Sequence, residues 1–305
     1  MESLEVLDQY RLNFNQSGLH ILNISLAIIM FGIALDIKLD NFKQIAKSPK
    51  SFLLGVLSQF LLLPAVTYVL VALLKPTDSV ALGMILVAAC PGGNISNFIS
   101  SLSKANVELS VSLTGASTLL SVVLTPLNFA FWGGLYVSHS QILHPIEIDF
   151  VQMFTTVILI LGIPLLLGSI FSKQFPGLTK RIKKPIKQLS ILIFGAFIIV
   201  ALANNFSLFM QFIHLFFLLV FAHNIVAIGT GFFLAKSFKL SLPDVKTLTI
   251  ETGIQNSGLA LVLIFNPKIF PPEMEIGGMA FIAAWWGIWH IISGLSLAYF
   301  WKNKS

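Results

Sequence analysis

Glu251 is the residue whose position most strongly indicates chemistry, because this acid lies inside an otherwise uncharged, largely apolar stretch from Leu248 to Phe265. Gln255 and Asn256 follow it about one helical turn later. A carboxylate at the depth of a lipid bilayer costs roughly 2.5 to 3.5 kcal/mol, so it normally has a compensating partner such as a cation. The stretch therefore favours an ion-binding site on a transport pathway.

A second polar cluster interrupts another apolar segment and reads Cys90-Pro-Gly-Gly-Asn-Ile-Ser-Asn97. Proline, glycines and amides at mid-membrane depth would leave backbone groups unpaired in lipid, so they must line a protein cavity or a polar site. We predict that the helices through both clusters break there. Close helix packing is an equally good explanation for any one of the glycines. The two clusters together favour a binding site.

Hydroxyl side chains recur at i, i+4, i+7 and i+11 in the segment after the first cluster, at Ser110, Thr114, Ser117 and Ser121. This spacing places them on one helix face. Spacing alone favours helix packing over ligand binding for all four. Gln59 is an amide in another apolar segment, and it suits a helix–helix hydrogen bond and a ligand role equally well.

The composition predicts an integral membrane protein, since 56% of the 305 residues are hydrophobic and 10% are charged, against about 25% charged in soluble domains. The net charge of +6 comes from basic residues in short loops, which membrane orientation explains better than nucleic-acid binding. The single cysteine, Cys90, excludes an internal disulfide. The sequence shows neither a Walker-type loop nor a His-Glu-x-x-His motif, so it does not predict an enzyme.

The predicted fold is all-α, with nine apolar segments long enough to cross about 30 Å of hydrocarbon. They lie at about 18–37, 51–74, 79–103, 107–136, 149–172, 186–205, 209–235, 243–266 and 276–301. A polar segment, 1–17, precedes them, and a short tail, 302–305, follows them.

The lysines and arginines predict the orientation, because they concentrate in cytoplasmic loops. With the N-terminus outside, all 19 of them except Arg11, Lys75 and Lys268 fall on the inner side. This distribution predicts a multi-pass protein of the cell inner (plasma) membrane with segment 1–17 outside and the 302–305 tail in the cytoplasm.

The two polar clusters occupy corresponding places in two three-span units, about 51–136 and 209–301. In each unit a plain span precedes the interrupted span and another follows it, and the two interrupted spans cross in opposite directions. Broken helices at matching positions are typical of inverted-repeat secondary transporters, which form their ion and substrate sites at the breaks.

These motifs resemble those of the bile acid:sodium symporter family, over essentially the whole chain from about residue 20. The matching segments are 29–35, 59–64, 90–97, 109–114, 251–260 and 289–290. The resemblance implies sodium-coupled uptake of an organic anion by a core domain, about 51–136 and 209–301, with two discontinuous crossing helices. A panel domain, about 18–37 and 149–205, would lie beside it, as in nine-span family members.

The resemblance also implies two sodium sites. A first cation set would comprise Ser96, Asn97, Ser110, Thr114 and Glu251. A second cation set would comprise Gln59, Glu251, Gln255 and the main-chain carbonyls of Thr252 and Ile254. Oxygen donors of these kinds suit a hard cation.

Asn94 and Asn256, one from each cluster, are candidates to hydrogen-bond the substrate, with His290 a weaker one. Many relatives have threonine in place of Asn94, so the choice among bile-acid-like, keto-acid and pantoate-like anions stays open. A proton-coupled organic anion transporter or a cation/proton antiporter of similar fold is the alternative, since Glu251 could carry a proton instead of binding sodium.

Overall fold

The computed structural model describes residues 24–25, 27–32, 34–35, 48–139, 150–204, 206–266, 268–271, 274 and 276–304. Over these residues the regular structure is helical, apart from one isolated bridge between Gly92 and Gln255. The helices are α4 (Pro49–Leu57), η2 (Ser58–Leu62), α5 (Leu63–Leu74), α6 (Asp78–Ala89), α7 (Ile95–Leu102), α8 (Val107–His139), α9 (Phe150–Val157), η3 (Ile158–Gly162), α10 (Ile163–Gln174), α11 (Pro176–Asn204), α12 (Phe206–Ser237), α13 (Leu242–Gly253), α14 (Ser257–Ile264) and α15 (Gly277–Lys304).

Five helical segments of the described chain are long and apolar enough to cross a membrane. They are Pro49–Leu74, Val107–His139, Val151–Gln174, Met210–Ser237 and Gly277–Lys302. The predicted all-helical membrane class is therefore confirmed. Half of the predicted span 18–37 lies outside the described residues, as do all of segment 1–17 and residue 305 of the tail. The count of nine spans stays a prediction.

A wide helical turn interrupts the first of these segments where α4 passes through η2 into α5. Pro64 lacks a backbone N–H, and its ring would clash with the carbonyl one turn earlier. The chain relieves that clash with the π-helical turn Ser58–Leu62, a form that often occurs at functional sites. Gln59 lies within this turn and is fully buried.

Two helices are broken in the middle, at the two polar clusters of the sequence. One break separates α6 from α7, and the other separates α13 from α14. The two breaks pair with each other: the Gly93 N–H donates to the Ile254 carbonyl at 2.7 Å, and the Asn256 N–H donates to the Pro91 carbonyl at 2.8 Å. Backbone groups that the helices leave unpaired are thus satisfied across the breaks, as an apolar surrounding requires.

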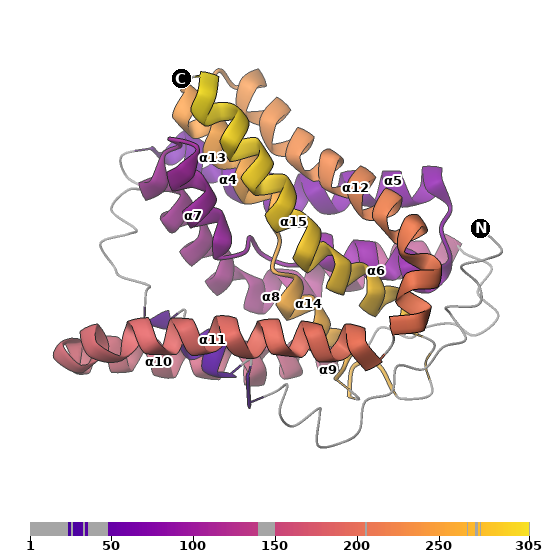
Figure 1. Ribbon diagram of the computed structural model, residues 1–305, viewed down its shortest axis with the longest axis horizontal. Helices are drawn as coiled ribbons and strands as arrows, with labels where there is room; N and C mark the ends of the chain where they lie inside the picture. Colours follow the sequence, from indigo (N-terminus) through magenta and orange to yellow (C-terminus); the bar gives the residue numbers. More distant parts are fainter. Residues whose placement is uncertain are drawn as a thin grey trace.

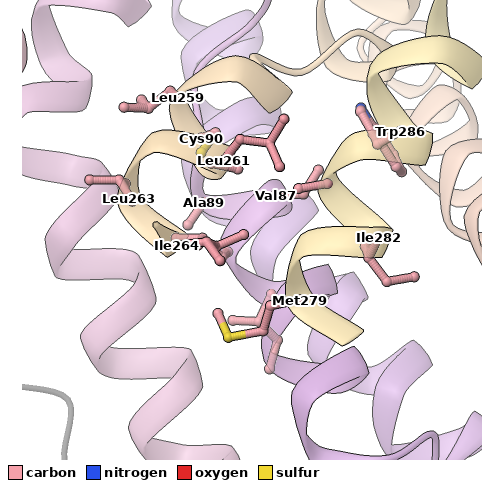
Figure 2. Close-up of a cluster of buried hydrophobic side chains, with 14 of the residues drawn as sticks. Val87, Ala89, Cys90, Leu259, Leu261, Leu263, Ile264, Met279, Ile282 and Trp286 are labelled. Carbon is pink, nitrogen blue, oxygen red and sulfur yellow. The ribbon is translucent and has the colours of Figure 1, made fainter. Parts of the chain in front are cut away.

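The hydrophobic core lies around α6, α14 and α15 (Figure 2). Every residue of α6 from Ser79 to Ala89 is buried, and Trp286 of α15 is the largest fully buried side chain. Figure 1 shows α15 running alongside α12, while α9, α10 and α11 lie together along one flank. The breaks are thereby held inside a packed helical body.

The contact between α6 and α15 depends on Gly83. A Cβ atom added there would lie 2.6 Å from the Cα of Met279, a backbone atom that cannot move alone. We expect Gly83→Ala to destabilise the protein by about 1 to 3 kcal/mol through overpacking, seen as a lower Tm in detergent. Gly134→Ala is the matched control, since a Cβ at that helical position meets nothing within 4 Å. Equal Tm values for the two variants would contradict this packing.

Candidate functional site

The Glu251 carboxylate lies at the centre of the paired breaks, fully buried, near the end of α13. Its Oε1 accepts hydrogen bonds from Ser96 Oγ of α7 at 2.6 Å and from Ser110 Oγ of α8 at 2.5 Å. Thr114 Oγ1, one turn further along α8, lies 3.1 Å from both carboxylate oxygens. Two helices far from Glu251 in the sequence, α7 and α8, thus direct three hydroxyls at one acid.

Asn97 completes the first cation set in space. Its Oδ1 lies 2.9 Å from Ser110 Oγ and 3.3 Å from Thr114 Oγ1. Ser96 Oγ and Thr114 Oγ1 are themselves 3.3 Å apart. The structure therefore brings together all five residues that the sequence assigned to this set.

The side chains of the first cation set make more oxygen–oxygen contacts than they have hydroxyl protons. Seven oxygen–oxygen contacts between 2.5 and 3.3 Å join the five side chains, whereas the three hydroxyls supply one proton each. A protonated Glu251 would add only one more. The other contacts must share one of these protons or bring lone pairs together, and a hard cation among the oxygens would make that arrangement favourable. The donor chemistry thus fits a bound sodium ion.

The hydroxyl row of α8 divides into two parts. Ser110 and Thr114 face Glu251, but Ser117 Oγ donates to the Thr114 carbonyl at 3.2 Å and Ser121 Oγ donates to the Thr118 carbonyl at 2.7 Å. Ser117 and Ser121 therefore bond within their own helix, a common habit of hydroxyl residues in helices. Spacing alone could not distinguish these two roles.

The second cation set gathers on the other side of the carboxylate. Gln255 Nε2 donates to the Thr252 carbonyl at 2.8 Å, and Gln59 Oε1 accepts from the Gly92 N–H at 3.3 Å. The Ile254 carbonyl faces the Gly93 N–H across the breaks. The side chains and carbonyls predicted for this set therefore lie around one short stretch of backbone, Pro91 to Gly93.

Gly92 leaves the space in which Gln59 and Glu251 meet. A Cβ atom on it would lie 3.0 Å from Glu251 Oε2, 3.3 Å from the Glu251 carbonyl and 3.4 Å from Gln59 Nε2. A Cβ atom there would force these neighbours to shift by a few tenths of an ångström, so glycine suits this close approach best.

Two buried amide atoms of the second cation set have no hydrogen-bond partner among the described residues. They are Gln255 Oε1 and Gln59 Nε2. Native structures rarely leave such atoms unpaired, so each one needs an explanation. Gln255 Oε1 is an acceptor with free lone pairs, on the side chain whose Nε2 donates to the Thr252 carbonyl, which suits a cation ligand. The residues present fit a second sodium ion.

The three candidate substrate residues occupy different environments. Asn94 is exposed and immediately precedes α7. Asn256 is partly buried, and its Oδ1 accepts from the Leu259 N–H at 3.1 Å, which caps α14. His290 of α15 is buried, and its Nδ1 has no partner among the described residues. No hydrogen bond between described residues joins His290 to Asn94 or Asn256, and their role in substrate binding stays a prediction.

Sequence reasoning missed two polar residues beside the second break. Asn224 Nδ2 donates to the Gly253 carbonyl at 2.8 Å, and Ser58 Oγ lies 2.7 Å from Thr252 Oγ1. Asn224 is an amide inside the apolar segment 209–235, so the criterion that identified Gln59 would also have identified it.

These features define a multi-pass helical membrane protein with a buried acid among oxygen donors at two paired helix breaks. Its sequence matches the model of the Sodium Bile acid symporter family over residues 23–212, more than half of the chain. The chain belongs to this family, and the resemblance inferred from the motifs is confirmed. The match ends before α13, so Glu251 lies beyond it.

Relatives extend the similarity over most of the chain. The "Uncharacterized sodium-dependent transporter YocS" of Bacillus subtilis (strain 168) is 31% identical over 286 residues, which cover 93% of this chain and 83% of the relative. The "Probable sodium/metabolite cotransporter BASS2, chloroplastic" of Oryza sativa subsp. japonica is 26% identical over 294 residues, 92% of this chain and 64% of the relative. The "P3 protein" of Mus musculus is 30% identical over 231 residues, 47% of its length.

Proposed function

We propose that this protein is a sodium-coupled symporter that moves an organic anion across the membrane by alternating access. The observation that carries the proposal is the excess of oxygen–oxygen contacts over protons around the buried Glu251 carboxylate. The family supports sodium as the coupling ion, as do the names of two relatives, a sodium-dependent transporter and a probable sodium/metabolite cotransporter.

The charges of the site explain why an anion would be the cargo. Two sodium ions bring two positive charges, and Glu251 offers one negative charge. A net positive charge in an apolar surrounding favours a nearby anion, because charges interact strongly where water is excluded. The half-helices α7 and α14 start at the breaks, so their partly positive N-termini add to this attraction. Ion and substrate binding would then be coupled without direct contact.

The larger arrangement follows the family pattern. Nine spans would form a core, about 51–136 and 209–301, and a panel, about 18–37 and 149–205, which rock against each other around the fixed ion sites. The N-terminus would lie outside the plasma membrane, and the 302–305 tail would lie in the cytoplasm. Asn94 and Asn256 would contact the anion, and His290 is a weaker candidate for such a contact.

A two-stage experiment tests this function. We expect at least one anion from a panel of bile acid conjugates, keto acids and pantoate to raise the Tm of the purified protein in NaCl but not in KCl. A ligand at one hundred times its Kd stabilises the folded state by about 2.7 kcal/mol. In liposomes, an inward sodium gradient should then drive accumulation of that anion, and a proton uncoupler should leave the accumulation unchanged. Uptake that ignores sodium and collapses with the uncoupler would instead establish proton coupling.

A further inference from the structure

The last turn of α13 presents three successive main-chain carbonyls, and a different donor holds each one. The Thr252 carbonyl accepts from Gln255 Nε2, the Gly253 carbonyl from Asn224 Nδ2, and the Ile254 carbonyl from the Gly93 N–H. The first and third carbonyls belong to the second cation set. The middle one belongs to neither cation set, and its donor comes from a separate helix, α12.

Asn224 is well placed to hold this turn rigidly. It is 1% exposed, and α12 packs directly on the backbone of α13. A Cβ atom on Gly231, two turns after Asn224, would lie 2.5 Å from the Leu248 carbonyl oxygen. The helix α12 therefore lies close against α13 here, and a shift of α12 away from α13 would break this contact.

Ser58 of η2 contacts the same turn through a side chain. Its Oγ lies 2.7 Å from Thr252 Oγ1, and both residues are fully buried. Ser58 begins the π-helical turn that also contains Gln59. One side chain of η2 thus lies in the second cation set, while its neighbour steadies a residue that supplies a carbonyl to that set.

We propose that Asn224 and Ser58 are positioning residues for the second cation set, an inference that rests on the proposed sodium coupling. Each peptide unit is planar, so the bond from Asn224 fixes the plane of the Gly253–Ile254 peptide, and the Thr252 and Ile254 carbonyls each join this plane through one Cα atom. The carbonyls of Thr252 and Ile254 then stay directed at the cation. Ser58 does the same for Thr252 through its side chain. Neither residue is itself a cation ligand.

The test compares sodium-dependent thermal stability of the full-length protein in detergent, with NaCl replaced by KCl at constant ionic strength. For Asn224→Leu, which keeps the branched shape but removes the donor, the NaCl concentration that gives a fixed rise in Tm should increase about tenfold. Loss of a group that orients a metal ligand typically has an effect of this size. Ser58→Ala is a smaller change and is the second variant in case Asn224→Leu does not fold. It should also increase the NaCl concentration needed for the same rise in Tm.

Thr67→Val is the matched control. Thr67 Oγ1 lies 2.8 Å from Nε2 of His223, the residue before Asn224, and both side chains are fully buried. This variant removes an equally buried bond to α12 away from the break. It should lower Tm in KCl and leave the sodium dependence unchanged.

The outcomes separate the two proposals. If the wild-type protein shows no sodium-specific rise in Tm, the proposed function fails, and the inference fails with it. If the wild type responds and neither Asn224→Leu nor Ser58→Ala differs from Thr67→Val in its sodium dependence, only the inference is overturned.

Discussion

Replacement of Glu251 by glutamine is expected to abolish the sodium-specific rise in Tm and, with it, sodium-driven anion uptake in liposomes. Glu251 is the one side chain that both cation sets share. Glutamine keeps the shape of the side chain but removes its negative charge, so two bound cations would have no neutralising partner. Removal of one partner from a buried ion pair costs about 3 to 5 kcal/mol, which is more than a hundredfold in affinity.

Two comparisons separate this effect from general damage. Glu108→Gln makes the same change of charge at an exposed residue in the first turn of α8, and its sodium response should match the wild type. In KCl, Glu251→Gln should unfold at a temperature equal to or above that of the wild type, because it no longer buries an acid without its cation. A Glu251→Gln protein with an intact sodium response would refute the site.

The side chains that gather around Glu251 were predictable to a large extent from the sequence and the family resemblance, but their geometry was not. Residue types and positions in the two clusters pointed to Ser96, Asn97 and Glu251 through the family resemblance. Ser96 and Glu251 are 155 positions apart, and only the pairing of the two breaks brings them together. Ser110 and Ser117 share one helix face in the sequence pattern, but the same pairing places Glu251 beside Ser110 and not beside Ser117.

The ends of the helices show a second limit of sequence reasoning. The predicted span 186–205 corresponds to α11, which begins ten residues earlier, at Pro176. Hydropathy reports how much of a segment suits lipid, and it falls in the basic stretch after Pro176. The helix continues through that stretch because lysine and arginine are good helix formers in any surrounding.

Gly92 was the least predictable part of the site, because a glycine in a membrane helix most often serves close packing. In the structure a Cβ atom on Gly92 would meet the Glu251 carboxylate, the Glu251 carbonyl and the Gln59 amide at once. Three segments, which contain Gln59, Gly92 and Glu251, together form the space beside Gly92. The sequence of any one of them does not predict it.

Substitution of Gly92 tests whether this space holds the cation. Gly92→Ala would place a methyl group 3.0 Å from Glu251 Oε2, and Gly92→Val would add two more carbons. We expect the sodium-specific rise in Tm to weaken in the alanine variant and to disappear in the valine variant. An apolar group there displaces the cation and forces Glu251 or Gln59 away from its ligand position, at an overpacking cost of about 1 to 3 kcal/mol.

Gly115→Ala provides the matched control, since a Cβ at that position of α8 meets nothing within 4 Å. It adds the same methyl group one residue after Thr114, and it should leave the sodium response intact. Alanine is also favoured over glycine inside a helix by roughly 0.5 to 1 kcal/mol, so the Tm of this variant in KCl should not fall. A graded loss through Gly92→Ala and Gly92→Val, with Gly115→Ala unaffected, would assign the loss to the space beside Glu251. A Gly92→Val protein that still responds to sodium like the wild type would place the cation elsewhere.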